Sequence, residues 1–157
     1  MIELEIPGWE GAIRLMHLVV DVNGTLAVDG ELREDAAELL GRIRDQLELH
    51  LVTGNIHGKQ AEIDRRLNVQ AYCLPSGNER EAKAAYIRSL GCDSVVAIGQ
   101  GGNYAGMVGE ARIGICVLSP EGLAADALLA ADVVAVDIVS ALDLLLHPLR
   151  LVGTLRK

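Results

Sequence analysis

Three apolar stretches of this sequence each end in a polar side chain that can take part in chemistry. Asp21 closes the apolar run 18–20, Thr53 closes the run 51–52, and Gln100 follows the run 95–99. Such runs are typical of parallel strands buried on both faces, and ligands bind beyond the carboxyl ends of these strands. We therefore expect a carboxylate, a hydroxyl and an amide to converge at one edge of a sheet.

The elements that must position these side chains alternate along the chain. Hydrophobic periodicity predicts strands at 2–6, 15–21, 47–53, 69–74, 94–98, 113–118 and 133–136, and helices at 34–46, 58–67, 78–90, 104–110, 121–129 and about 139–155. Alternating strands and helices predict an α/β fold, with a doubly wound parallel sheet in a three-layer α/β/α arrangement. Residues 1–157 are expected to form one domain.

The charge and amino-acid composition of the chain argue against several classes of binding partner. The net charge is −8 and no basic run is present, which argues against nucleic acid and anionic membranes as partners. No apolar run reaches the roughly 18 residues of a membrane span. Residues 1–5 carry acids where a signal peptide has positive charges, so we expect a cytoplasmic protein. Cys73, Cys92 and Cys116 are scattered, which predicts reduced thiols and no zinc cluster.

Two further groups of residues leave alternatives open. The leucine-rich segment 142–155 fits either a final helix packed on the sheet or a subunit contact in a homo-oligomer. The histidines are too far apart in the sequence to show a ligand spacing. We interpret His17, His50 and His147 as structural or surface residues and place His57 at the edge of the expected site, while Trp9 is interpreted as a packing anchor.

The polar motifs resemble those of the haloacid dehalogenase superfamily, and more narrowly the small soluble relatives of the P-type ATPase phosphorylation domain. The resemblance spans about residues 15–117 and rests on these motifs, in this order: Asp21-x-Asn23-Gly24-Thr25, Thr53-Gly54-Asn55, Lys83 and Gly99-Gln100-Gly101-Gly102-Asn103. It implies a Rossmann-like hydrolase of phosphate esters or anhydrides. Segments 25–47 and 55–83 are too short to hold an inserted lid, so we expect no cap domain.

The resemblance also implies a role for each motif. Asp21 would attack phosphorus and carry an aspartyl-phosphate, Thr53 would bind a phosphoryl oxygen, and Lys83 would neutralise charge, with Lys59 as the competing lysine. Mg²⁺ would rest on Asp21, the Asn23 carbonyl and Gln100. The remaining residues expected to bind the substrate or its phosphate are Val22, Gly24, Thr25, Gly54, Asn55, Gly101 and Asn103.

Three positions depart from the family pattern. Asn23 stands where phosphatases of this superfamily carry an acid that protonates the leaving group, and an amide cannot do so. Gln100 and Tyr104 stand where acids support the metal, with Asp93 and Glu110 as neighbouring acids. We therefore expect a slow phosphohydrolase acting on a phosphorylated small molecule or protein. The alternative is a catalytically impaired binding or regulatory module, or an oligomer subunit.

Overall fold

The computed structural model describes residues 1–54 and 58–157, and its centre is a parallel sheet of six strands. The strands are β3 (His17–Asp21), β6 (Glu48–Thr53), β7 (Tyr72–Cys73), β8 (Val95–Gly99), β9 (Ile113–Val117) and β10 (Val133–Ala135). Their order across the sheet is β10-β9-β8-β3-β6-β7, and every neighbouring pair is parallel. The predicted parallel α/β sheet is confirmed.

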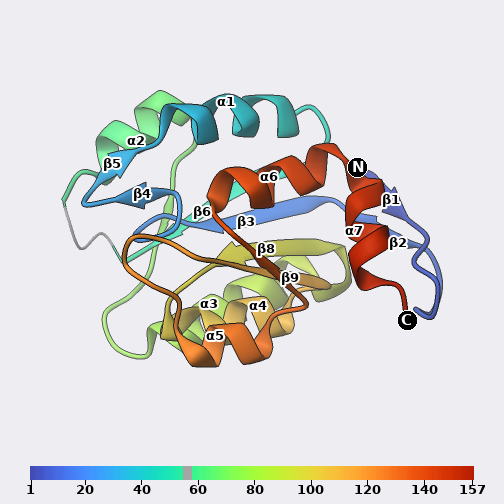
Figure 1. Cartoon of the computed structure of the whole chain (residues 1–157). Coiled ribbons are helices and arrows are strands. Elements are labelled where there is room, and N and C mark those ends of the chain that lie inside the picture. Colours follow the sequence, from blue (N-terminus) through green and yellow to red (C-terminus); the bar gives the residue numbers. More distant parts are fainter. Residues whose placement is uncertain (55–57) are drawn as a thin grey trace.

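Helices cover both faces of this sheet, as predicted. Figure 1 shows α1 (Glu34–Ile43), α2 (Gln60–Leu67) and α6 (Ile138–Leu146) on one face, and α3 (Glu79–Leu90), α4 (Ala105–Glu110) and α5 (Ala125–Ala130) on the other. Short 3₁₀ turns at Cys92–Ser94 and Gly102–Tyr104 flank β8. Within the described residues, no separate domain covers the carboxyl edge of the sheet.

The core is aliphatic and is divided by the sheet. Along β3, Leu18 and Val20 pack into the layer beneath α1 and α6, whereas Val19 packs into the layer with α3 and α4. This alternation follows from the period of two along a strand. Both faces of β3 are buried, and this explains why its sequence reads as a continuous apolar run rather than an alternating one.

The topology determines where the chain can bind a ligand. From β3, the chain adds β6 and β7 on one side and then crosses back to place β8 on the other side. The carboxyl ends of β3 and β8 therefore flank a switch point, and in open α/β sheets ligands bind in the crevice at such a point. Asp21 ends β3 and Gln100 follows β8, so both residues lie at this position.

Several element boundaries differ from the sequence prediction. The predicted strand 15–21 is two strands, because β2 (Ile13–Leu15) leaves the main sheet to pair antiparallel with β1 (Ile2–Leu4). The predicted strand 69–74 shortens to the edge strand β7. A hairpin of β4 (Ala27–Val28) and β5 (Glu31–Leu32), joined by a turn at Asp29-Gly30, was not predicted.

The prediction of one continuous C-terminal helix over about 139–155 was wrong, because this segment forms two helices. Two helices, α6 and α7 (Pro148–Leu155), meet at an angle of 103°. Pro148 has no backbone N–H to donate and occupies the first turn of α7, while His147 is non-helical with φ −127° and ψ 66°. Leu151 and Leu155 are buried and Leu149 is exposed, so α7 packs largely on its own domain. The subunit contact stays a prediction.

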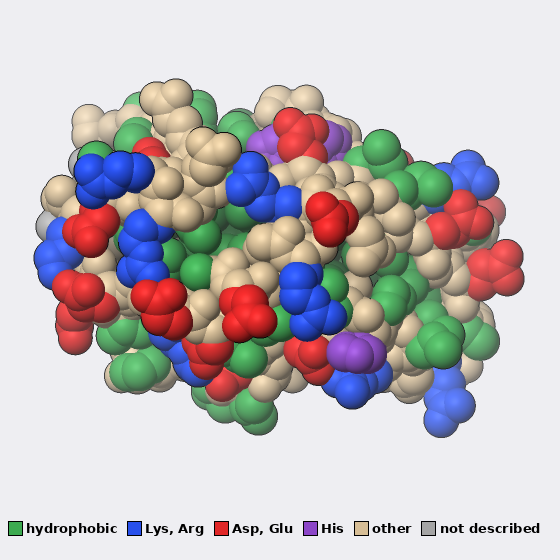
Figure 2. Space-filling view, turned by 90° about the horizontal axis from the view of Figure 1, so that it is seen from above, with side chains coloured by type: hydrophobic (Ala, Val, Ile, Leu, Met, Phe, Trp, Pro, Cys, Tyr) green, Lys and Arg blue, Asp and Glu red, His purple; other side chains and the backbone are tan. Residues whose placement is uncertain are grey.

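The face formed by α1, α2 and α6 carries charges of both signs. Figure 2 shows Lys and Arg side chains interspersed with Asp and Glu side chains on this face. Surface ion pairs such as Arg33–Asp35 and Arg66–Glu34 account for part of this mixing. Among the described residues, no single helix has the length and apolar character to cross a membrane, although the bent pair α6 and α7 together passes that test.

Candidate active site

Asp21 is the centre of the polar site at the carboxyl end of β3, and its side chain is fully buried. The Thr25 hydroxyl donates a 3.0 Å hydrogen bond to Oδ2. Oδ1 accepts no hydrogen bond from the described part of the chain. The Lys83 ammonium lies 3.7 Å from Oδ1, beyond hydrogen-bond length, and forms an ion pair with it. One carboxylate oxygen is therefore held in place and the other is unsatisfied.

Lys83 reaches Asp21 from helix α3 on the neighbouring layer. Asn78 caps this helix, because its side chain accepts a 3.2 Å hydrogen bond from the amide of Glu81. The Lys83 side chain is 1% exposed, and its ammonium lies 3.2 Å from the centroid of the Tyr104 ring. The negative face of an aromatic ring attracts a cation. Tyr104, at the position of a family acid, thus holds the lysine against Asp21.

Burial moves the pKa values of this pair toward one another. Desolvation raises the pKa of Asp21 to about 7, against the lowering effects of the Lys83 charge and the Thr25 hydrogen bond. Desolvation also lowers the pKa of Lys83 to about 8, although Asp21 and Glu79 oppose that change. Perturbed titratable groups of this kind cluster at functional sites. At neutral pH both Asp21 and Lys83 are therefore close to their pKa values.

Asn23 and Thr53 form the second contact across the site. The Asn23 amide Nδ2 donates a 2.9 Å hydrogen bond to Thr53 Oγ1, which joins the loop after β3 to the end of β6. The predicted phosphate-binding hydroxyl of Thr53 thus lies beside the residue that replaces the family acid. In this position the Asn23 side chain serves as a hydrogen-bond donor.

Gly24 has a steric role that the sequence suggested only in part. Its φ is +77°, and a Cβ at this position would collide with the side chains of Gln100 and Glu121. The Val22 amide donates to the Val52 carbonyl and the Gly24 amide to the Ala27 carbonyl. These two amides, predicted to cradle a phosphate, are therefore engaged within the fold. Gly24 instead permits the Gln100 and Glu121 side chains to approach the turn closely.

A cavity of about 170 Å³ opens beside these residues. The described residues that line it are Asn23, Gly54, Glu79, Gln100, Gly101, Asn103, Tyr104 and Glu121. Asn103 donates a 2.6 Å hydrogen bond to Glu79 Oε2, and a Cβ on Gly54 would lie 3.0 Å from Glu79 Oε1. The predicted Gly54, Gly101 and Asn103 therefore share one cavity wall. Asp21 itself does not line the cavity.

Two acids of this site, Glu79 and Glu121, were missed from the sequence. Glu79 opens helix α3, where an acid is expected for the helix dipole alone. Glu121 was placed inside a predicted helix 121–129, but α5 begins only at Ala125. Residues 119–122 instead form a turn, with the Gly122 amide donating to the Ser119 carbonyl. This turn lets Glu121 reach the cavity, and no motif in the sequence signals it.

Other candidates from the sequence are placed elsewhere. Lys59, the competitor of Lys83, pairs with Glu31 on the surface. Glu110 pairs with Arg88 at 3.0 Å, and Asp93 is exposed. Asn55 and His57 lie outside the described residues. Of the two candidate lysines, it is Lys83 that contacts Asp21.

The oxygen atoms at this edge fit a hard divalent cation such as the Mg²⁺ that the resemblance implies. Asp21 Oδ1 is a buried carboxylate oxygen with an unsatisfied lone pair. The Gln100 side chain, through its amide nitrogen Nε2, and the Glu121 oxygen Oε2 both approach Gly24, so Gln100 would have to turn its amide to present its oxygen. Mg²⁺ binds through one or two carboxylates together with neutral oxygens and water. Glu121 thus offers a second carboxylate, although Tyr104 stands at the position of a family acid.

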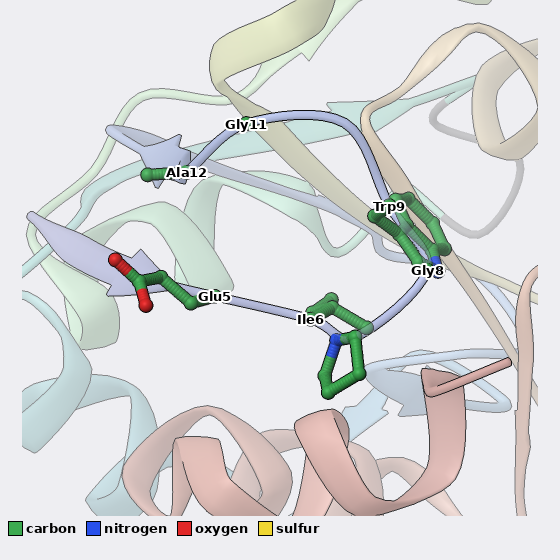
Figure 3. Close-up of a pocket in the computed structure, with 7 residues that line it drawn as sticks. Glu5, Ile6, Gly8, Trp9, Gly11 and Ala12 are labelled. Carbon is green, nitrogen blue, oxygen red and sulfur yellow. The ribbon is translucent and has the colours of Figure 1, made fainter.

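A wider cavity lies away from this chemistry. It measures about 460 Å³ and is lined by the loop between β1 and β2. Figure 3 shows Glu5 at the start of this loop, Trp9 near its turn, and Gly11 and Ala12 on the arm that returns to β2. Trp9 packs against the core and its indole N–H donates to the Leu155 carbonyl at 2.9 Å, which confirms its role as a packing anchor. Glu5 is the one titratable side chain among the described residues that line this cavity, so the cavity brings together no cluster of catalytic groups.

Comparisons with known proteins agree with the architecture of the sheet. A putative haloacid dehalogenase superfamily (subfamily III A) hydrolase from Legionella pneumophila superposes with a TM-score of 0.71 at 15% identity, covering 91% of this chain and 88% of that one. The chain has the haloacid dehalogenase fold. The superfamily resemblance predicted from the motifs is confirmed at the level of the fold.

Two further solved structures with the haloacid dehalogenase fold are also similar to this chain. The 3-deoxy-D-manno-octulosonate 8-phosphate phosphatase of Moraxella catarrhalis, solved with magnesium, phosphate and KDO, has a TM-score of 0.66 at 20% identity and covers 85% of this chain and 86% of its own. The catalytic domain of the CPx-ATPase CopB-B has a TM-score of 0.59 at 25% identity, covering 73% of this chain and 46% of its own.

Sequence comparison identifies a relative with no described activity. Uncharacterized protein MJ0073 of Methanocaldococcus jannaschii is 38% identical over 84 residues, which are 51% of this chain and 90% of that protein. This chain belongs to the same family as that archaeal protein. No family model matches the chain.

Proposed function

We propose that the chain is a phosphohydrolase in which Asp21 accepts the phosphoryl group. The observation that carries this proposal is the state of Asp21 Oδ1, a buried carboxylate oxygen without a hydrogen-bond donor in the described chain. Lys83 stands 3.7 Å away at the switch point of the sheet. A desolvated carboxylate with one unsatisfied oxygen is a suitable nucleophile, and carboxylates form covalent intermediates of this kind.

The bonds and protons of the proposed reaction are accounted for by the residues of the site and by water. Asp21 Oδ1 attacks phosphorus, the bond from phosphorus to the leaving oxygen breaks, and that oxygen keeps the electron pair and takes a proton from water. Lys83 offsets negative charge on the transferred group, and the Thr53 hydroxyl is placed to donate to a phosphoryl oxygen. Water then attacks phosphorus, which releases inorganic phosphate and restores the Asp21 carboxylate.

A divalent cation would be held by Asp21, the Asn23 carbonyl, Gln100 and Glu121. When bound, it supplies positive charge that lets two anions, the nucleophile and the phosphate, approach one another. Structural neighbours with this fold contain magnesium or cobalt. We propose Mg²⁺ because the offered ligands are all oxygen atoms, which suit a hard ion.

Slow turnover is part of the proposal. Asn23 has no proton to give to a leaving group, and its amide already donates to Thr53. General acid–base assistance is worth roughly 10²–10⁴-fold. Asp21 is also fully buried, so its side chain or its neighbours must move before a substrate reaches Oδ1. Both features favour an aspartyl-phosphate that forms and then persists.

We propose a phosphorylated small molecule as the substrate. The cavity beside Asp21 is small, at about 170 Å³, and a phosphate with a short organic group would fill it. Two acids, Glu79 and Glu121, line the same cavity, so a bound cation is needed to offset their charge. A phosphorylated protein is the alternative, since no described residues cap this edge of the sheet.

The test is intact-mass analysis after incubation with acetyl phosphate and Mg²⁺. We expect one added phosphate in the wild type, none in Asp21→Asn, and an undiminished adduct in the matched surface control Asp93→Asn. Asn23→Asp should shorten the lifetime of the adduct by roughly 10²-fold, because it restores an acid. An adduct that survives in Asp21→Asn, or the absence of any wild-type adduct, overturns the proposal in favour of a binding module.

A further inference from the structure

A second group of metal-binding side chains lies at the opposite edge of the sheet from Asp21. His17 opens strand β3, and Glu48 and His50 lie at the start of strand β6. The two strands are parallel, and their register pairs His17 with Glu48 and Val19 with His50. Residues 33 positions apart in the sequence therefore become neighbours on one face of the sheet.

The distances within this group are short. His17 Nδ1 lies 3.1 Å from His50 Nε2, and the Glu48 carboxylate oxygens lie 3.4 Å from His17 Nδ1 and 3.9 Å from His50 Nε2. Each residue offers one ligand atom, and these atoms lie within 4.8 Å of one another. Two nitrogens bound to one tetrahedral Zn²⁺ stand roughly 3.3 Å apart, given Zn–N bonds of about 2.0–2.1 Å. The observed nitrogen pair is close to that separation.

The Tyr86 side chain also fixes the orientation of the His50 ring. Its second ring nitrogen, Nδ1, lies 2.9 Å from the Tyr86 hydroxyl, and the Tyr86 ring stacks on Tyr72 with centroids 4.7 Å apart. A hydrogen bond from Nδ1–H to Tyr86 leaves the Nε2 lone pair facing His17. Metal-ligating histidines are typically fixed in this way through the other nitrogen.

We propose that His17, Glu48 and His50 bind a divalent transition metal, with Zn²⁺ as the preferred ion. Two imidazoles and one carboxylate are a ligand set that zinc uses, and a fourth position is left for water. Glu48 is mostly exposed, so an ion can enter from solvent. His17 and Asp21 are four positions apart along strand β3, which corresponds to about 13 Å. The site is therefore distinct from the Asp21 centre and does not depend on the proposed phosphatase activity.

The first measurement is a Zn²⁺ titration of chelator-treated, tag-free protein by calorimetry. We expect one ion per chain in the wild type. His17→Ala and His50→Ala should each weaken binding at least 100-fold, and Glu48→Gln by about 10-fold. The matched control is His147→Ala, which removes an exposed histidine paired with Asp143 and should bind as the wild type does. Equal binding by His50→Ala, or equal loss in His147→Ala, overturns the proposal.

A second measurement keeps the proposal testable if a variant folds poorly. Co²⁺ bound to the wild-type protein should give visible absorption typical of nitrogen and oxygen ligands, without a thiolate charge-transfer band. A thiolate band would assign the ion to a cysteine such as the exposed Cys73 and would overturn the proposal. Zn²⁺ should also raise the wild-type Tm, because an ion that binds only the folded state stabilises it.

Discussion

The two ends of strands β3 and β6 carry two different kinds of polar group. At the carboxyl end, Asp21 is fully buried, and it pairs with a lysine that is 1% exposed. At the amino end, the His17 and His50 side chains are 21% and 12% exposed, beside the open carboxylate of Glu48. Burial at the first end therefore changes the pKa values of its groups strongly, whereas the second end presents its side chains to solvent.

Helix α3 supports both ends. Lys83 and Tyr86 are three positions apart, so they lie on the same face of the helix. Lys83 reaches Asp21 and Tyr86 reaches His50. One helix thus positions a charge at one end of the sheet and a hydrogen-bond partner at the other. Substitutions on α3 can separate the two proposed sites, because each one should affect a single end.

Lys83→Met gives the largest expected effect. Methionine keeps much of the buried volume but removes the charge beside Asp21, which raises the pKa of that carboxyl further and leaves the transferred group uncompensated. We expect the rate of adduct formation from acetyl phosphate to fall roughly 10²–10³-fold, the range for loss of one such electrostatic partner. Intact-mass time courses measure it. Zn²⁺ affinity should be unchanged, and a parallel loss at both ends would show general unfolding instead.

Tyr86→Phe is the counterpart at the other end, with a smaller expected effect. It removes the hydroxyl that lies 2.9 Å from His50 Nδ1 but retains the ring stacked on Tyr72. Hydrogen-bond partners of the second ring nitrogen of ligating histidines typically contribute 10–100-fold in affinity, and we expect about 10-fold weaker Zn²⁺ binding here. Calorimetry at constant pH checks this value. Adduct formation on Asp21 should match the wild type, and Ser89→Ala on the exposed face of α3 serves as the control.

The two ends also differ in how far the sequence could predict them. Asp21, Gly24 and Thr25 are adjacent in the sequence, and strand-end logic places Thr53 and Gln100 beside them without knowledge of side-chain contacts. His17 and His50 become neighbours through the register of β3 against β6, which no local pattern states. The role of Glu121 was not predicted for a similar reason, since its position depends on where α5 begins. Contacts that depend on strand register or on where a helix begins were the ones missed, whereas convergence at the strand ends was predicted.

The proposed reactions at the two ends should also differ in their pH dependence, and this effect is smaller than those of the two substitutions. Adduct formation requires ionised Asp21, whose pKa is about 7, and protonated Lys83, whose pKa is about 8. The rate should therefore rise as the pH increases through 7 and fall above 8. Between pH 6 and 7.5 the rise should be roughly six-fold, from the fractions of the reactive protonation states alone.

Zn²⁺ binding should follow a different pH profile, since it needs neutral imidazoles and is lost only as these protonate. Burial lowers the pKa of His50, so this ligand stays neutral to more acidic pH than an exposed histidine does, and Zn²⁺ affinity should fall only on the acidic side of the range. Adduct formation and Zn²⁺ affinity measured across pH 5.5–9 test both profiles. A flat rate between pH 6 and 7.5 would show that the buried Asp21–Lys83 pair does not control the reaction, and the contrast between the two ends would then rest on geometry alone.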